Sequence, residues 1–176
     1  INAIDELRRV SKCDVDPMVS TVSDIDRAIN QYYGISGSIE NILKDMGTQE
    51  AVKVEADKVA SDAAEAGESS PVAKLINLLV QRATADRASD IHIEMEEKNL
   101  RVRYRIDGIL HEVESPPAYL HPVLVSRIKV LARMDIAETR LPQEGRFQRK
   151  VENRDIDIRV STYPTIYGEK VVMRLL

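Results

Sequence analysis

Residues 91–114 alternate between apolar and polar or charged side chains, and this alternation is the strongest constraint that the sequence places on the fold. A period of two residues is typical of β-strands that bury one face. Two turn signals interrupt the stretch, Lys98-Asn99 and Asp107-Gly108, and Asp-Gly favours the type I′ turn of a tight hairpin. We therefore predict three antiparallel strands with one apolar face in a core and one charged face outside it.

A two-residue turn at Lys98-Asn99 fixes the expected register of the first hairpin. The predicted pairs are Glu96/Arg101, Glu94/Arg103 and His92/Arg105 on the charged face, and Met95/Val102, Ile93/Tyr104 and Ile91/Ile106 on the apolar face. The Asp107-Gly108 turn then places Arg103 opposite Glu112 and Arg101 opposite Glu114. These arginines thus have acidic or polar partners, and aromatic residues make up only 4% of the chain. We expect an ion-paired face and no nucleic-acid site.

The rest of residues 71–176 continues the same domain. Ser70 is a predicted N-cap with Pro71 at the first helical position, and a second helix is expected from Pro122 to about Met134. A loop follows at 138–145, and the last strand is expected at 169–176. A third hairpin around Asn153-Arg154 is predicted to pair Phe147/Val160, Val151/Ile156 and Lys150/Asp157. The fold class is therefore α+β, an antiparallel sheet with helices against one face.

The first 70 residues have a different character. Residues 3–10 show helical spacing, and a capping box at Ser23 and Asp26 begins a helix expected to end at Gly34. Residues 48–70 are rich in Ala, Glu, Asp, Lys and Ser, a composition typical of a connector. We predict a partial small α+β N-terminal domain at 1–47, a linker at 48–70 and the main domain at 71–176.

The sequence lacks the residues and motifs on which several classes of function depend. The one cysteine, Cys13, can form no internal disulfide or multi-cysteine zinc site, which fits a reducing compartment, and the three histidines fall on different elements. No Gly-x-x-x-x-Gly-Lys-Ser/Thr and no Gly-x-Ser-x-Gly occurs. No apolar run is long enough to span a bilayer. We expect no metal site, no nucleophilic catalysis and no self-contained nucleotide hydrolase. The chain also lacks an initial Met and is expected to be a piece of a longer protein.

Arg159 and Arg174 stand among apolar neighbours in the last two expected strands. An arginine in such surroundings needs a strong acceptor, and its planar fork suits carboxylates and phosphates equally well. One alternative is an internal ion pair with Asp155, Asp157 or Glu169. The other is a phosphate presented by a companion domain. The sequence leaves both open.

Four motifs in order resemble one family, the bacterial type IV pilus extension ATPases (PilB-like) and type II secretion ATPases (GspE-like). They are Ala88-Ser89-Asp90-Ile91-His92-Ile93-Glu94, Arg105-Ile106-Asp107-Gly108-Ile109-Leu110, Leu141-Pro142-Gln143-Glu144-Gly145-Arg146, and Arg159-Val160-Ser161-Thr162-Tyr163-Pro164-Thr165 with Gly168-Glu169-Lys170-Val171-Val172-Met173-Arg174-Leu175-Leu176. The resemblance covers residues 71–176. Residues 23–34 are similar, more weakly, to the end of the family's small N-terminal domain.

The resemblance implies that residues 71–176 form a PAS-like domain, followed in the whole protein by a RecA-like domain that binds ATP and Mg. It also implies a cytoplasmic homo-hexamer at the inner face of the inner membrane, with peripheral attachment and an inner-membrane platform protein as partner. Arg159 and Arg174 match the family's two phosphate-contacting arginines, and Arg140 and Arg146 are expected at an interdomain or subunit interface. No cofactor and no catalytic residue is expected within these 176 residues. The other hypothesis is a PAS-like adaptor or sensor that binds a small ligand or a partner protein.

Overall fold

The computed structural model describes residues 2–22, 24–25, 70–151 and 154–176. The chain divides into two units, Ile1–Gly37 and Ser38–Leu176, which are described separately. In the first, α1 spans Asn2–Ser11 and agrees with the helix expected at 3–10. The helix expected at 23–34 lies almost entirely outside the described residues, as does the linker expected at 48–70. The predicted domain limits thus stay predictions.

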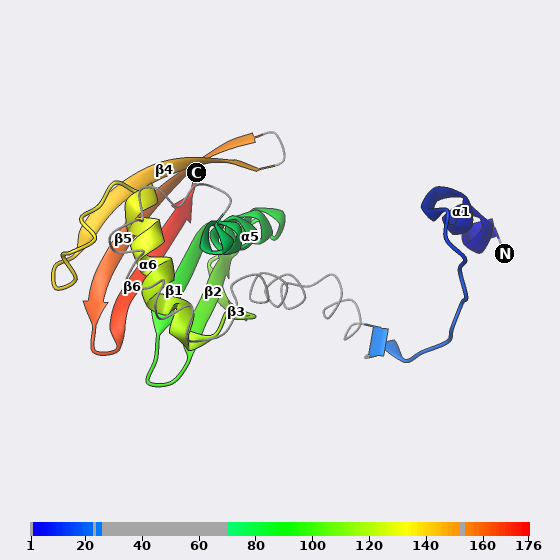
Figure 1. Cartoon of the computed structure of the whole chain (residues 1–176), viewed down its shortest axis with the longest axis horizontal. Coiled ribbons are helices and arrows are strands. Elements are labelled where there is room, and N and C mark those ends of the chain that lie inside the picture. The colour runs from blue at the N-terminus through cyan, green and yellow to red at the C-terminus, as the bar shows by residue number, and fades with distance from the viewer. Residues whose placement is uncertain (1, 23, 26–69, 152–153) are drawn as a thin grey trace. The chain divides into compact units, whose positions relative to one another are not determined.

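A six-stranded antiparallel sheet forms the second unit (Figure 1), with the strand order β3-β2-β1-β6-β5-β4. The strands are β1 (Asp90–Met95), β2 (Leu100–Ile106), β3 (Ile109–Val113), β4 (Gln143–Val151), β5 (Arg154–Thr165) and β6 (Gly168–Leu175). Strands β1–β3 and strands β4–β6 each pair with their neighbours in sequence. The pairing of β1 with β6 joins these two groups. That central pairing is not local in sequence, so the periodicity gave no prediction of it.

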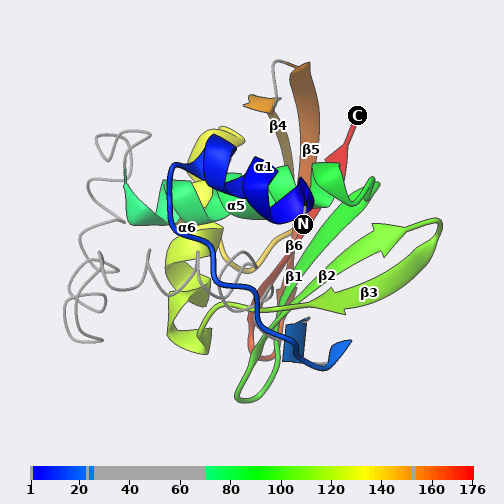
Figure 2. The ribbon, with the colours of Figure 1, turned by 90° about the vertical axis from the view of Figure 1, so that its right-hand side faces the viewer.

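Two helices pack on one face of this sheet, as the turned view in Figure 2 shows. α5 spans Pro71–Ala85, and the Ser70 hydroxyl accepts a hydrogen bond from the backbone N–H of Ala73 at 3.2 Å, which confirms the predicted cap. α6 spans His121–Leu131, preceded by a short 3₁₀ turn at Ala118–Leu120. The fully buried core residues include Leu75, Leu79, Ile91, Ile93, Val102, Tyr104, Leu124, Ile128, Ile158, Val171 and Met173. The α+β class and the one-sided helices are confirmed.

The expected registers of the first and third hairpins are wrong by two residues. In the first hairpin Glu94 lies opposite Arg101 and Met95 opposite Leu100, and the Glu96 N–H donates to the Asn99 carbonyl at 2.9 Å. The turn is therefore centred one residue earlier than predicted. A shift of two keeps every side chain on the same face, so hydrophobic alternation cannot detect it. Lys98-Asn99 contains no glycine, and neither residue has a positive φ that would mark the position of the turn.

The third hairpin shows the same error for the same reason. Phe147 lies opposite Ile158, Lys150 opposite Asp155 and Val151 opposite Arg154. By contrast, the second hairpin agrees with its prediction, including Arg103 opposite Glu112. Its turn residues Asp107 and Gly108 have φ of 50° and 83°, the left-handed values that a type I′ turn requires. A glycine that the turn demands fixes the register.

The second helix is shorter than expected. α6 ends at Leu131, three residues before Met134, because Arg133 adopts a left-handed φ of 58°. The N–H groups of Arg133 and Met134 donate back to the carbonyls of Val130 and Lys129, a common closure of a helix C-terminus. β4 begins at Gln143, inside the loop predicted at 138–145.

Candidate functional site

Three arginines lie side by side on neighbouring strands of the sheet. The Cα partner of Arg146 on β4 is Arg159 on β5, and the Cα partner of Arg159 on the other side is Arg174 on β6. Like charges placed directly opposite each other destabilise a sheet. The row therefore works against the fold unless another group supplies the compensating charge.

The alternation of each strand places this row on the face opposite the helices. Ile158 and Val160 flank Arg159 and are buried, and Met173 beside Arg174 is fully buried. Because successive side chains point to opposite faces, the arginines between these core residues project outwards. The Arg174 side chain is 65% exposed, and the Arg146 and Arg159 residues are exposed. Their apolar sequence neighbours belong to the other face.

The acceptor of Arg174 is Asp90, which the sequence analysis did not include among the expected partners of this arginine. Arg174 Nε donates to Asp90 Oδ1 at 3.0 Å. Of the partners expected, Glu169 pairs instead with Lys129 on the other face. Within the described segments, no hydrogen bond or ion pair is found for the side chain of Arg159 or of Arg146. Asp90 was missed because only the non-local pairing of β1 with β6 brings it opposite Arg174.

Asp90 is held firmly. Its side chain is 6% exposed, the Ser89 hydroxyl donates to Oδ2 at 2.7 Å, and Arg105 Nε lies 3.4 Å from Oδ2. Burial by itself would raise the pKa of Asp90, but the hydrogen bonds from Ser89 and Arg174 outweigh it and hold the pKa below its usual value. Asp90 is therefore ionised at neutral pH.

A surface groove of about 620 Å³ runs over the arginine row. We call it the arginine groove, and its lining includes Arg146, Arg159, Arg174, Asp90, Glu144 and Tyr163. Arg140 is not among its lining residues. Arg140 lies in the loop between α6 and β4, is 89% exposed and has Glu138 at 4.0 Å. The structure thus brings together three of the four arginines singled out in the sequence.

The charged face beyond the groove is largely neutralised by ion pairs. Glu94 contacts both Arg103 and Lys170 at 2.6 Å. Arg101 contacts Glu96 at 2.7 Å and Glu112 at 3.1 Å, while β3 ends before Glu114. The expected pairs Glu94/Arg103 and Glu96/Arg101 therefore exist, as diagonal contacts in the corrected register. This neutralisation contrasts with Arg146 and Arg159 in the arginine groove, for which no ion pair is found among the described residues.

His92 is enclosed within this charged network. It is 8% exposed, and neither ring nitrogen has a hydrogen-bond partner among the described residues. Burial, followed by the charges of Lys170 and Arg105, lowers the pKa of His92. The imidazole is accordingly neutral at pH 7. In the part of the chain that the structure describes, no group of three or more His, Cys, Asp or Glu is placed to bind a metal ion.

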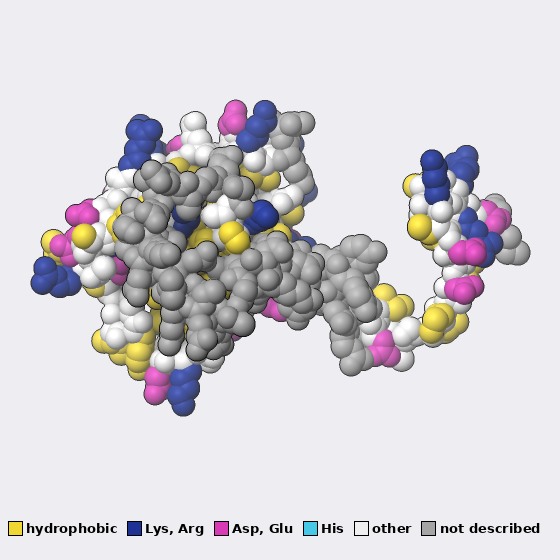
Figure 3. Space-filling view, in the orientation of Figure 1, with side chains coloured by type: hydrophobic (Ala, Val, Ile, Leu, Met, Phe, Trp, Pro, Cys, Tyr) yellow, Lys and Arg dark blue, Asp and Glu magenta, His cyan; other side chains and the backbone are white. Residues whose placement is uncertain are grey.

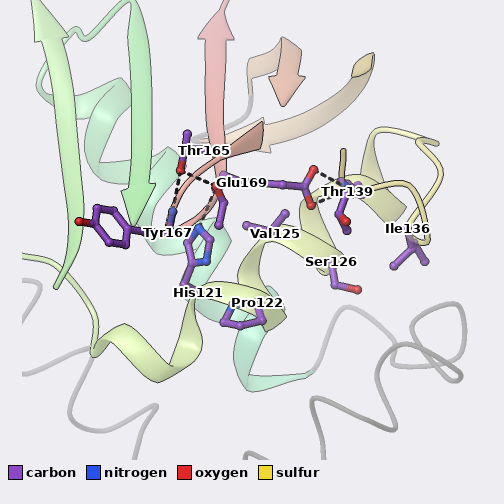
Figure 4. A pocket seen from close by; sticks show the side chains of 11 residues that line it. His121, Pro122, Val125, Ser126, Ile136, Thr139, Thr165, Tyr167 and Glu169 are labelled. Carbon is purple, nitrogen blue, oxygen red and sulfur yellow. Dashed lines mark hydrogen bonds and ion pairs between the residues drawn. The ribbon is translucent and has the colours of Figure 1, made fainter. Parts of the chain in front are cut away.

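A second cavity, of about 410 Å³, lies along α6 from His121 to Lys129 (Figure 4). His121 Nε2 lies 2.8 Å from the carbonyl oxygen of Glu169. The Lys129 side chain is 1% exposed, contacts the Glu169 carboxylate at 2.6 Å and donates to the Glu138 carbonyl at 2.7 Å. Burial also lowers the pKa of His121. Lys129 and Glu169 thus satisfy each other, whereas the buried hydroxyl of Ser126 in the lining has no hydrogen-bond partner among the described residues.

The surface on the helix side has a mixed character. Figure 3 shows basic and acidic side chains next to one another at the margins of this view of the second unit. Among the described residues, no helix has the length and apolar character to cross a bilayer.

Comparison with known proteins identifies the family. The family model of the "Type II/IV secretion system protein" matches residues 65–176. The "Type IV pilus assembly ATPase PilB" of Myxococcus xanthus is 43% identical over the whole chain, which covers 31% of that protein. The "Type II secretion system protein E" of Xanthomonas campestris is 44% identical over 99% of the chain and 30% of its own length.

A third relative, the "Type II secretion system protein HxcR" of Pseudomonas aeruginosa, is 45% identical over 87% of the chain and 33% of its own length. The chain thus spans about a third of the length of the curated relatives it matches. These findings confirm the resemblance drawn from the four motifs. The chain belongs to the type II/IV secretion system protein family.

Proposed function

We propose that this chain is the N-terminal regulatory and coupling region of a hexameric assembly ATPase that powers type IV pilus extension or type II secretion. A RecA-like domain of the whole protein holds ATP together with Mg. The arginine groove of this chain receives the phosphates of that ATP. The observation that carries the proposal is the row of Arg146, Arg159 and Arg174 on three adjacent strands. Arg146 and Arg159 have no internal counterion among the described residues.

Physical chemistry supports an anion in this position. Arginine stays protonated at any working pH, and its fork matches the oxygen spacing of a phosphate. A polyphosphate would turn the unfavourable row into a favourable site, because each guanidinium gains a counterion. The closing of this domain and the RecA-like domain around ATP would then convert nucleotide binding and hydrolysis into motion. That motion would pass to a platform protein at the inner face of the inner membrane.

The test uses two proteins, this chain and the longer ATPase that contains it. Arg159→Ala should leave the melting temperature of the chain nearly unchanged, because its side chain is exposed and no ion pair is found for it among the described residues. Arg174→Ala should lower it only modestly, because the buried Asp90 loses one partner but keeps Ser89 and Arg105. In the longer ATPase the same changes should lower the rate of phosphate release, by roughly 10³- to 10⁵-fold if the arginines stabilise the transferring phosphoryl group. The chain alone should release no phosphate.

Arg154→Ala is the matched control, since Arg154 is an exposed arginine of the same strand outside the groove. It should leave the turnover of the longer ATPase near that of the unchanged protein. Full turnover in both the Arg159→Ala and the Arg174→Ala proteins would reject the proposal. A large fall in melting temperature would instead assign the arginines to the stability of the fold.

The second candidate function is a sensor module, which the cavity along α6 favours. That cavity has the volume of a small-ligand site, and His121, Ser126, Thr139 and Thr165 supply polar groups. Calorimetry of the chain with nucleotides, including cyclic-di-GMP, separates the two functions. Tight nucleotide binding that Arg159→Ala leaves unchanged supports a sensor at this cavity, whereas binding that Arg159→Ala weakens supports the arginine groove and the coupling region.

A further inference from the structure

Arg174 is tethered by only one of its three guanidinium nitrogens. Its Nε donates to Asp90 Oδ1 at 3.0 Å, and no hydrogen bond of the two terminal nitrogens is found among the described residues. The side chain is nevertheless 65% exposed and lines the arginine groove. A guanidinium held through Nε keeps its pair of terminal nitrogens available for a bidentate contact with a phosphate.

The tether itself is rigid. Asp90 is the first residue of β1, and its side chain is 6% exposed. Ser89 and Arg105 hold the other carboxylate oxygen, and Arg105 is in turn fixed by a 2.8 Å hydrogen bond to the Gly108 carbonyl. The carboxylate is thus restrained from two sides before any ligand arrives.

Arg174 needs such a restraint because of its neighbour. Arg159 lies directly opposite Arg174 on the adjacent strand, so the two positive groups repel each other. A long and largely exposed side chain also has many rotamers, whose loss on binding costs free energy. An ionised carboxylate at Nε opposes both effects.

We propose that Asp90 is a positioning residue of the arginine groove, which holds Arg174 through Nε so that its two terminal nitrogens are presented to a phosphate. The inference rests on the proposed function, because it assumes that the groove binds phosphates. The opposite role for Asp90 is that of an anion competing with the phosphate for Arg174. The two roles predict opposite effects of removing the carboxylate.

The experiment measures binding of tripolyphosphate to the 176-residue chain at low salt by calorimetry. Asp90→Ala should weaken binding by about fivefold or more, because the ordered charged hydrogen bond at Nε is lost. Asp90→Asn keeps an acceptor oxygen of the same shape and should bind more tightly than Asp90→Ala. Equal affinity of these two variants would contradict a role through the Nε contact.

Glu144→Gln is the matched control. Glu144 lines the same groove, and the change removes one negative charge without touching the contact between Asp90 and Arg174. It should tighten binding of tripolyphosphate slightly, because the groove becomes more positive. Asp90→Ala behaving like Glu144→Gln would show a competing anion and would overturn the positioning role.

The side-chain NMR signal of Arg174 Nε–H provides a readout that a general loss of stability does not move. It should be a distinct, slowly exchanging signal in the unchanged chain and in Asp90→Asn, and should exchange faster in Asp90→Ala at a temperature where all three are folded. An Arg174 signal unaffected by Asp90→Ala would reject the inference.

The binding measurements distinguish failure of the positioning role of Asp90 from failure of the proposed function. If the unchanged chain binds tripolyphosphate but Asp90→Ala binds equally well, the positioning role fails and the proposed function stands. If the unchanged chain and Arg159→Ala bind tripolyphosphate with the same affinity, the groove is not a phosphate site and both proposals fail.

Discussion

At the scale of single residues, the buried ion pair of Lys129 and Glu169 dominates the region where α6 meets the sheet. Lys129 and Glu169 have side-chain exposures of 1% and 9%, and both carboxylate oxygens lie within 2.7 Å of Lys129 Nζ. A buried ion pair is costly to break on one side only, because the remaining charge loses its partner inside the protein.

We therefore predict that Glu169→Gln lowers the free energy of unfolding by about 3 kcal/mol or more. Urea denaturation followed by circular dichroism measures it. The double change Lys129→Met with Glu169→Leu should recover much of the loss, because apolar groups replace both charges. A single variant as stable as the unchanged chain would show that the pair contributes nothing.

The residue scale also shows what the sequence could predict of the site. Arg159 and Arg174 were identifiable because they interrupt apolar strands, and Arg146 because it belongs to a family motif. Their alignment in one row was not predictable, because it depends on the two-residue shift of the third hairpin. The partner of Arg174 was unpredictable for a further reason, since β1 and β6 are separated by most of the domain.

At the scale of elements, the second hairpin is the best-specified part of the sheet. Gly108 has a φ of 83°, and no atom lies within 4 Å of the position that a Cβ would occupy. Any loss on substitution must then come from the backbone conformation and not from a steric clash.

Gly108→Ala should therefore lower the free energy of unfolding by about 1 kcal/mol, the cost of a left-handed conformation for a residue with a Cβ. Thermal unfolding measures the change. Lys98→Ala is the matched control at the first turn, where Lys98 is exposed and has no positive φ. It should change stability by less than about 0.5 kcal/mol. Equal effects at both turns would contradict this assignment.

The elements also explain why the fold class was predictable while its details were not. The signals in the sequence each extend over only a few residues. Apolar alternation specifies strands, the cap at Ser70 specifies the start of a helix, and the Asp107-Gly108 turn specifies one hairpin. The turns of the first and third hairpins contain no glycine. The early end of α6 depends on Arg133, a residue type that rarely marks a left-handed position.

At the scale of the whole molecule, the sequence predicts two modules joined by residues 48–70. The composition of that stretch offers too few apolar side chains to bury the surface that would lock two modules together. Limited proteolysis should thus cut first between Thr48 and Ser70 and leave a stable fragment of 71–176, identified by mass spectrometry. A first cut within 71–176 would contradict the predicted domain limits.

The arginine row also has a mechanical consequence. Hydrogen bonds of an antiparallel sheet run perpendicular to its strands, which is the direction of the row from Arg146 through Arg159 and Arg174 to Asp90. A pull on any one of these side chains is thus transmitted along the hydrogen bonds and not across the more compliant packing between sheet and helices. A ligand bound to the row would pull on four strands at once, and the sheet would move as one rigid body.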